Sequence, residues 1–547
     1  MTRSASKSRV RMQPWLPDIK REALSMQYTH AITDATVEPK QGAPNIGGNI
    51  KAGVEFGPEH RLRCEDIESV ALSRRATSFS ESSLEAMRSS ADILRAAHER
   101  GDEIYGLTTG FGPHVKYDAD DDIIAQGCGL IAHLGAGWGQ LASREVVRAT
   151  MAARCQALAQ GRSGVAVDAA LALHALLEAD ITPAVPEVGS VGASGDLIPL
   201  AHVARVMTGD GRVLCEDGSV RAASEVLAEH GLQPIALTGR DALAVVNGTS
   251  FMTAYAPLAV ARAERLLAVA EDLTGWAFRS LAGRAECLDD RLHEARGHVG
   301  QIASAANIAA AAAGGPEDTS RPLQEVYSLR CAPQFLGACR DQLSHARTLI
   351  ERELSGVNDN PVVCGTVEDP AVLHGGNFQG QQVAFAADAA NSAITQMTLL
   401  IERQLDVVLN PELNGGAPLL LAWQPGATSG MAGAQITATA IAADVRRNST
   451  PSAVATMPTN GRNQDVVSMG TMAARVAYEQ TDRAAAVLGV YAIALTQLDY
   501  LRAHGRAPGE RVGPPAWLPD VQGFAEDRPL FDDINRLAAV FVQPMAS

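Results

Sequence analysis

Aromatic residues, basic charge and paired cysteines are all scarce in this chain of 547 residues. Phe, Trp and Tyr make up only 4% of it, whereas alanine and leucine are abundant, which favours helices packed on helices over sheets. The formal charge is -16, so no excess of basic residues is available to attract phosphate groups. We therefore expect neither nucleic acid nor an anionic membrane surface as a partner, and a small molecule is the better candidate ligand.

The eight cysteines are scattered and form no C-x-x-C pair. This spacing argues against a zinc cluster and against a disulfide framework, and it predicts reduced thiols and no bound metal. We expect no membrane-spanning segment, that is, no run of about 18 or more strongly apolar residues. The start of the chain, Met1-Thr2-Arg3-Ser4, lacks the apolar core of a secretion signal. These absences predict a cytoplasmic protein.

Composition divides the chain into three parts. Residues 1–57 contain Pro, Gly, Lys and polar residues without helical or alternating periodicity, so we expect a flexible N-terminal extension. Residues 58–230 are expected to form an N-terminal domain, and residues 231–547 a helical bundle with a C-terminal helical region. Within residues 212–220, an Asp-Gly pair flanked by apolar residues predicts one small hairpin.

Helical periodicity marks several segments. Ser82 followed by Glu85 matches a capping box, and apolar residues at helical spacing come after it. Two longer helices are expected around residues 266–273 and 394–405, where apolar residues share one face. The segment 484–498 is apolar on nearly every side, which is typical of a helix buried among other helices. The predicted fold class is therefore mainly α, with a long central helical bundle.

A glycine-rich loop with the tripeptide Ala193-Ser194-Gly195 precedes an apolar segment. A bare tripeptide of this kind is more often a tight turn whose Ser or Asp caps the next helix, and we read Thr428-Ser429-Gly430 as such an ordinary loop. The whole segment from Gly189 to Leu200, however, resembles the signature of the histidine, phenylalanine and tyrosine ammonia-lyases and of related aminomutases. That resemblance implies their helical fold, which is similar to that of fumarase and aspartase.

The resemblance further implies that the tripeptide forms a 4-methylidene-imidazol-5-one (MIO) ring. The Gly195 nitrogen would attack the Ala193 carbonyl carbon, and loss of two waters would turn the Ser194 side chain into an exocyclic methylene. The residue types suit this chemistry because Gly195 has no side chain to block ring closure and Ser194 has the hydroxyl that leaves. Attachment to the methylidene carbon makes the substrate amine a better leaving group, so no metal or diffusible cofactor would be required.

Other segments match the family in order between about residues 100 and 475. In the segment from Ile104 to Gly112, Tyr105 would be the base that removes the β-hydrogen, on a mobile lid, and Gly112 would contact the substrate. An ordinary tyrosine has a pKa of about 10, so Tyr105 needs help toward phenolate, which nearby helix N-termini could provide. Outside this context, Tyr105 would be a packing aromatic beside a glycine-rich turn.

The resemblance assigns roles to five more side chains. Asn247 would contact the ring and the substrate, and Tyr327 would lie near the electrophile. Arg330 would clamp the substrate carboxylate through a bidentate pair, and Asn463 and Gln464 would support the carboxylate and amine end. Without the family context, an isolated arginine is more often a solvated surface charge, and Asn-Gly is only a turn.

The aromatic ring of the substrate should meet His133 and Leu134, and Phe378 would form a wall of the pocket. Phenylalanine-selective relatives tend to carry Phe-Leu at the first two positions and histidine-selective ones Ser-His, whereas His-Leu is typical of tyrosine-selective relatives. His133 can hydrogen-bond a phenol, and a buried donor left unpaired by phenylalanine would cost about 1 to 3 kcal/mol. Gln464 stands where histidine lyases place a glutamate, which disfavours histidine as the substrate.

These residues favour a tyrosine ammonia-lyase that converts L-tyrosine to p-coumarate and ammonia. The alternatives are a tyrosine 2,3-aminomutase, which would return ammonia to the β-carbon and give β-tyrosine, and a phenylalanine or histidine ammonia-lyase. The choice between lyase and aminomutase depends on how long the Tyr105 region and the loop near residues 315–321 enclose the products. The resemblance also implies a homotetramer in which three subunits build each active site.

Overall fold

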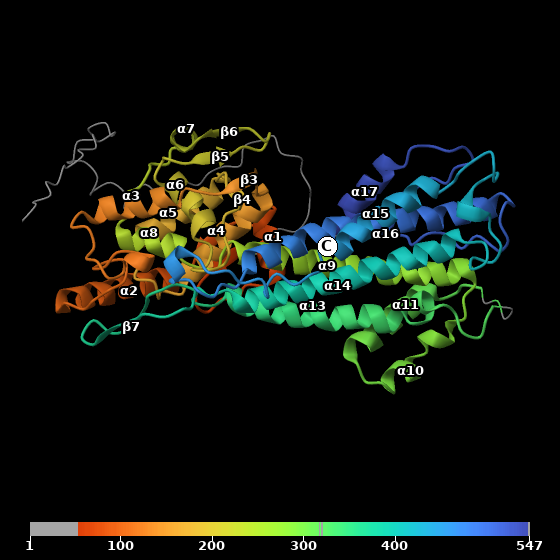
Figure 1. The fold of residues 1–547 in the computed structure, drawn as a ribbon, viewed down its shortest axis with the longest axis horizontal. Helices are drawn as coiled ribbons and strands as arrows, with labels where there is room; N and C mark the ends of the chain where they lie inside the picture. Colours follow the sequence, from red (N-terminus) through yellow and green to blue (C-terminus); the bar gives the residue numbers. More distant parts are fainter. Residues whose placement is uncertain (1–52, 317, 319–320, 545–547) are drawn as a thin grey trace, which may run out of the picture. The chain divides into compact units, whose positions relative to one another are not determined.

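The computed structural model describes residues 53–316, 318 and 321–544 (Figure 1). The first 52 residues of the expected N-terminal extension lie outside the described residues, and strand β1 (Val54–Phe56) occupies its end. The described chain is mainly helical, with its strands confined to two-stranded pairs. The predicted mainly α fold is therefore confirmed.

Long helices form the core of the bundle (Figure 1). Helix α14 packs between α13 and α16, all three contact α9, and α11 lies on α9 and α13. The bounds of these helices are α9 (Met252–Leu281), α11 (Val299–Ala312), α13 (Ala332–Leu354), α14 (Gln381–Leu409) and α16 (Gly470–Ala503). The helices predicted around residues 266–273, 394–405 and 484–498 are confirmed within α9, α14 and α16.

Helix α16 corrects one expectation from the sequence. It is long and apolar enough to cross a membrane by length and composition, so the expected absence of such a segment is wrong by that criterion. However, 83% of its most apolar window is buried inside the protein. Burial among neighbouring helices therefore explains its composition. It is the one helix of this kind in the part of the chain that the structure describes.

A second group of helices surrounds the buried helix α4, which contacts α1, α5 and α9. Helix α8 packs on α3 and α6, and the predicted boundary at residues 230 and 231 falls just before it. The helices of this group are α1 (Cys64–Ala71), α2 (Glu81–Arg100), α3 (Ile123–Leu134), α4 (Arg144–Ala159), α5 (Val167–Glu178), α6 (Leu197–Met207), α7 (Ala223–Glu229) and α8 (Gly239–Val246). The shorter helices elsewhere are α10 (Asp290–Glu294), α12 (Tyr327–Arg330), α15 (Ala432–Arg447) and α17 (Phe531–Val542), and the 3-10 helices are η1 (Gly112–His114), η2 (Ala285–Leu288), η3 (Leu419–Leu421) and η4 (Asn460–Arg462).

The start of α2 differs from the predicted one. Ser80, not Ser82, is the N-cap, and its hydroxyl accepts from the Ser83 amide at 3.1 Å. The Ser82 hydroxyl instead donates to Glu59 at 2.6 Å. The capping-box pattern therefore located the helix but placed its first turn two residues too late.

Four strand pairs complete the described chain. Strand β1 pairs in parallel with β2 (Thr77–Phe79), and the other three pairs are antiparallel. The hairpin predicted within residues 212–220 is confirmed by β5 and β6. The antiparallel pairs are β3 (Trp138–Leu141) with β4 (Pro186–Val188), β5 (Arg212–Leu214) with β6 (Val220–Ala222), and β7 (Val362–Gly365) with β8 (Pro370–Leu373). Strand β3 follows α3, and β4 precedes the loop that begins at Gly189. The pairing of β3 with β4 therefore holds α3 close to this loop.

Candidate active site

The loop between β4 and α6 holds Ala193, Ser194 and Gly195 against the segment after α8. The Asp196 amide donates to the Gly248 carbonyl at 2.7 Å, and Gly195 pairs with Gly248 in a parallel bridge. Gly195 has a φ of 68°, and a Cβ on it would collide with the Gly248 carbonyl. Only glycine can therefore occupy this position without moving the neighbouring backbone.

Asp196 is a buried carboxylate that fixes the loop, although its place before an apolar segment predicts only a helix cap. It stands at the N-cap of α6, but its side chain makes no capping bond. It instead accepts from Ser190 Oγ at 2.7 Å, from Thr471 Oγ1 at 2.5 Å and from the Met252 amide at 2.8 Å. Burial raises the pKa of Asp196, while these donors lower it. One carboxylate thus joins the loop to the starts of α9 and α16.

Ser194 contacts two of the predicted site residues. Asn247 Nδ2 donates to the Ser194 carbonyl at 3.2 Å, and Gln464 Nε2 donates to Ser194 Oγ at 2.8 Å. Gln464 is itself held, because its Oε1 accepts from Thr459 Oγ1 at 2.6 Å. The Oδ1 of Asn247 is buried and has no hydrogen-bond partner among the described residues. Ser194 therefore lies where three separate segments of the chain meet.

The Tyr105 turn lies beside the same segments. Tyr105 Oη accepts from the Gly112 amide at 2.7 Å, at the first residue of η1. Helix η1 contacts η4, and the Asn460 side chain lies against Gly112, four residues before Gln464. Burial raises the pKa of Tyr105, while the Gly112 amide and the charge of Arg240 lower it. The expected help from a helix N-terminus is present at η1, but burial outweighs it within this chain.

The predicted aryl pocket residues lie on elements that adjoin this site. Helix α3, which carries His133 and Leu134, packs against α6 and α8. Helix α6 follows the Ser194 loop, and α8 precedes the segment that begins at Asn247. Leu134 is buried, whereas His133 is exposed within this chain, so the expectation of a buried donor at His133 is wrong for the single chain. Its Nδ1 lies 3.1 Å from the Gly129 carbonyl. Because a carbonyl only accepts, Nδ1 is the donor, and Nε2 of the neutral ring is left as an acceptor. Phe378 is half-buried just before α14, and Asn463 is exposed at the end of η4.

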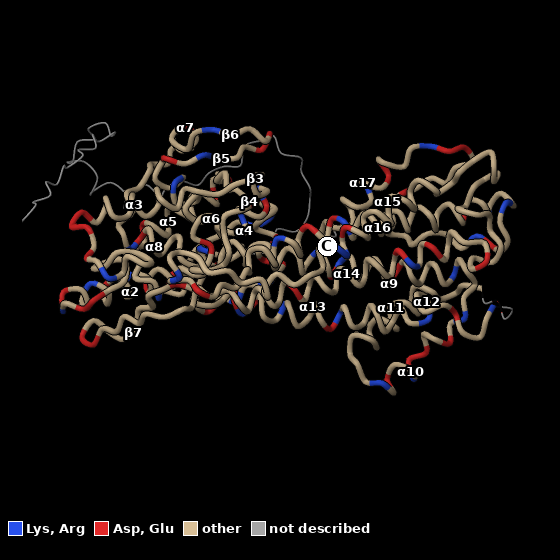
Figure 2. The backbone as a smooth tube through the Cα atoms, viewed as in Figure 1, with Lys and Arg blue, Asp and Glu red and all other residues tan. Residues whose placement is uncertain are grey.

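Tyr327 and Arg330 are not brought to this site. Both lie in α12, where the Arg330 guanidinium stacks over the Tyr327 ring at 4.6 Å and its Nε donates to the Glu325 carbonyl at 2.9 Å. The Tyr327 side chain is 68% exposed. Figure 2 shows α12 at the end of the bundle opposite α8.

The length of α14 sets the separation between α12 and the Ser194 loop. At one end, Gly380 packs on Met252, whose amide bonds Asp196. At the other end, Gln404 Nε2 donates to the Ser328 carbonyl in α12 at 2.8 Å. Gln404 follows the first residue of the helix, Gln381, by 23 positions, so the two ends lie about 35 Å apart. Arg330 therefore cannot reach Ser194 of its own chain.

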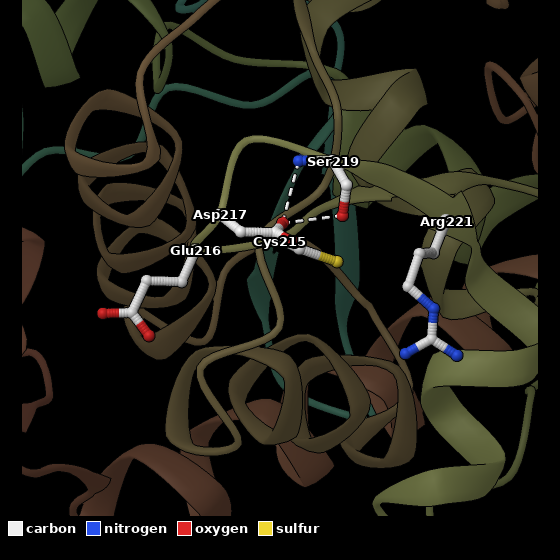
Figure 3. Close-up of a pocket in the computed structure, with 5 residues that line it drawn as sticks. All are labelled: Cys215, Glu216, Asp217, Ser219 and Arg221. Atoms are coloured by element: carbon white, nitrogen blue, oxygen red, sulfur yellow. Dashed lines mark hydrogen bonds between the residues drawn. The ribbon is translucent and has the colours of Figure 1, made fainter.

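A hollow of about 540 Å³ lies on the β5–β6 hairpin, and Figure 3 shows the five residues that line it. Two of its charged groups bind neighbouring residues: Asp217 accepts from the Ser219 amide at 2.9 Å, and Arg221 donates to Glu229 at 2.8 Å. None of the predicted site residues lines it. The lining residues are Cys215, Glu216, Asp217, Ser219 and Arg221. We assign it no part in the chemistry.

Comparison with known proteins identifies the family. The model of the family described as aromatic amino acid lyase matches residues 62–513. The chain belongs to the aromatic amino acid lyase family. The predicted resemblance and the prediction of a lyase-family enzyme are thereby confirmed.

Named relatives of this aromatic amino acid lyase family member cover most of the chain. A tyrosine ammonia-lyase of Cupriavidus metallidurans is 39% identical over 88% of this chain and 95% of that protein. An MIO-dependent tyrosine 2,3-aminomutase of Streptomyces globisporus is 37% identical over 87% of this chain and 93% of that protein. The crystal structure of tyrosine aminomutase from Streptomyces globisporus matches with a TM-score of 0.82 and 35% identity, over 90% of this chain and 97% of that one. The predicted ammonia-lyase fold, similar to that of fumarase, is confirmed.

Proposed function

We propose that this chain is a tyrosine ammonia-lyase, which converts L-tyrosine to p-coumarate and ammonia. The observation that carries the proposal is that Asn247 and Gln464 both donate hydrogen bonds to Ser194, beside the Tyr105 turn. These residues come from distant segments, and each matches a segment of the family in sequence. The 39% identity to a tyrosine ammonia-lyase supports the choice of substrate.

The residues around Ser194 fit an MIO ring formed from Ala193-Ser194-Gly195. The Gly195 backbone lies so close to Gly248 that no side chain is tolerated, and the glycine this requires has no Cβ to obstruct attack of its nitrogen on the Ala193 carbonyl. The Ser194 hydroxyl, which must be lost, accepts a hydrogen bond from Gln464 Nε2. The buried Oδ1 of Asn247 offers an acceptor with no partner among the described residues. When formed, the ring supplies an electrophilic carbon that takes up the substrate amine and makes ammonia a better leaving group.

The remaining chemistry falls to the side chains of the chain. Tyr105, as phenolate, takes the β-hydrogen of the substrate onto its Oη, and the Gly112 amide stabilises the negative charge on that oxygen. Asn247 and Gln464 hold Ser194 in place from two sides. His133 presents Nε2 as an acceptor, which matches the hydroxyl proton of a phenol and not the bare ring of phenylalanine.

We also propose that the active protein is a cytoplasmic homotetramer whose sites are shared among three subunits. About 35 Å of α14 separates the end near the Ser194 loop from the part that contacts α12, the helix of Arg330, so another copy has to provide the carboxylate clamp. Apolar side chains near η4 support a contact with such a copy: Val454 is 74% exposed, and Met457 and Val466 are each 63% exposed.

The test is to incubate the purified full-length protein with L-tyrosine and to follow p-coumarate by absorbance and chromatography. β-Tyrosine is measured in the same samples, and L-phenylalanine and L-histidine are offered in parallel. Ser194→Ala is the control that cannot form the ring. Asp217→Ala, in the exposed hairpin, shows whether an alanine substitution outside the proposed site affects the reaction. We expect p-coumarate from wild type and Asp217→Ala and none from Ser194→Ala.

Each alternative result has a distinct meaning. Substantial β-tyrosine early in the reaction would make the chain an aminomutase. Turnover of phenylalanine or histidine but not tyrosine would contradict the role of His133 while leaving the electrophile in place. Absence of any reaction with the three amino acids would contradict the proposed activity.

A further inference from the structure

The backbone of the Tyr105 turn is anchored by a histidine from a distant segment. The Tyr105 amide donates to Nε2 of His374 at 3.1 Å, across 269 positions of sequence. The neighbouring amides are satisfied inside the turn: the Ile104 amide donates to Thr108 Oγ1 at 2.8 Å, and the Gly106 amide to Thr109 Oγ1 at 3.4 Å. Among these three amides, only that of Tyr105 bonds outside the turn.

We propose that His374 is a positioning residue, which holds the Tyr105 turn against the segment that follows β8. The proposal rests on the proposed function, because it gives Tyr105 the role of base. The His374 side chain does not touch the reacting atoms. It acts through the backbone of Tyr105, and so sets where the Tyr105 Oη lies relative to the Ser194 loop.

The backbone that follows His374 is joined through Asn360 to a buried ion pair. The amide of the next residue, Gly375, donates to Asn360 Oδ1 at 2.7 Å. Beside Asn360, Asp359 pairs with Arg240 at 2.6 Å, and both of these side chains are at most 3% exposed. Arg240 belongs to α8, the helix that ends at Asn247. The anchor therefore connects the Tyr105 turn to the same helix that positions Asn247 at the Ser194 loop.

The anchor requires a neutral imidazole. An N–H can donate only to an unprotonated nitrogen, so Nε2 must be bare and Nδ1 must carry the proton. The charged groups that act on His374 are Glu103, just before the Tyr105 turn, and Arg240 of α8. Burial lowers the pKa of His374, Glu103 raises it and Arg240 lowers it further. The neutral form, and with it the anchor, is thus present at neutral pH and is lost as pH falls through the lowered pKa.

Two substitutions in the full-length protein separate the anchor from the histidine itself. His374→Ala removes the acceptor, whereas His374→Gln keeps an acceptor oxygen at similar reach and cannot be protonated. His98→Gln is the matched control, since His98 is an exposed histidine of α2. For each protein we would measure kcat and KM with L-tyrosine, and hydrogen exchange of the peptide that covers residues 104–112.

We expect His374→Ala to lower kcat about tenfold with a smaller change in KM, and to speed exchange in this peptide by about tenfold, as expected for one lost hydrogen bond. His374→Gln should restore most of both values. As pH falls from about 6.5 through the lowered pKa of His374, kcat of His374→Gln should rise relative to that of wild type, because only the histidine loses its acceptor. His98→Gln should match wild type throughout.

The proposal is overturned if His374→Ala exchanges and reacts like wild type, or if His374→Gln is as impaired as His374→Ala at every pH. The exchange measurement needs no substrate. If wild type does not act on tyrosine, the proposed function fails, and the exchange of His374→Ala and His374→Gln still shows whether His374 anchors the turn.

Discussion

Tyr105 has to act as a base although burial raises the pKa of its phenol above the ordinary value. A raised pKa leaves the phenolate a minority at neutral pH, so its population grows as pH rises toward that pKa. We therefore expect kcat to increase from about pH 7 to about pH 10, and we expect Tyr105→Phe to lower kcat by at least about 100-fold. Steady-state rates across this range check both statements.

The matched control for this prediction is Tyr117→Phe, because Tyr117 lies in the same stretch of chain but is 58% exposed. It should keep the wild-type rate and the wild-type pH profile. A kcat that does not change with pH, or a Tyr105→Phe protein that remains active, would show that another group removes the β-hydrogen.

At the scale of single elements, Asp196 links the Ser194 loop to two helices. Asp196→Ala would remove the carboxylate that accepts from Ser190 Oγ, Thr471 Oγ1 and the Met252 amide, and it would leave the Met252 amide unsatisfied. Since an unsatisfied buried polar group costs about 1 to 3 kcal/mol, we expect a lower melting temperature and a loop too mobile for efficient ring closure. Thermal unfolding and the ultraviolet absorbance of the ring measure the two effects. Asp217→Ala, which alters an exposed carboxylate, should change neither, and normal absorbance in Asp196→Ala would refute the positioning role.

The sequence predicts helices and a hairpin from local patterns, but it does not predict contacts between distant segments. Apolar periodicity predicts α9, α14 and α16 because burying one face stabilises a helix whatever lies opposite it. The Asp-Gly pair predicts the β5–β6 hairpin for a similarly local reason. The partners of Asp196 are not predictable in this way, because Met252 and Thr471 lie 56 and 275 positions away and no local pattern records such contacts. Likewise, the resemblance names Arg330 as a site residue, but only the fold places it far from Ser194. The domain division and the individual site roles stay predictions.

At the scale of the whole molecule, the separation between Ser194 and Arg330 has a direct consequence for mixed oligomers. Ser194→Ala and Arg330→Ala should each be inactive as pure proteins, because each removes an essential group. If a site takes these two groups from different chains, a mixed oligomer contains some sites in which both are intact. Random assembly of equal amounts of the two variants should then restore about a quarter of the wild-type activity.

The control mixture pairs Ser194→Ala with Asn247→Ala. Asn247 donates to Ser194 of its own chain at 3.2 Å, so every site that receives an intact Ser194 receives the altered Asn247 with it. This mixture should stay inactive. Two different affinity tags, used in succession, would isolate oligomers that contain both variants before the p-coumarate assay. If such mixed oligomers of Ser194→Ala and Arg330→Ala are as inactive as the control, Arg330 does not complete the site of a neighbouring chain. The carboxylate clamp must then be sought among residues on the Ser194 side of the bundle.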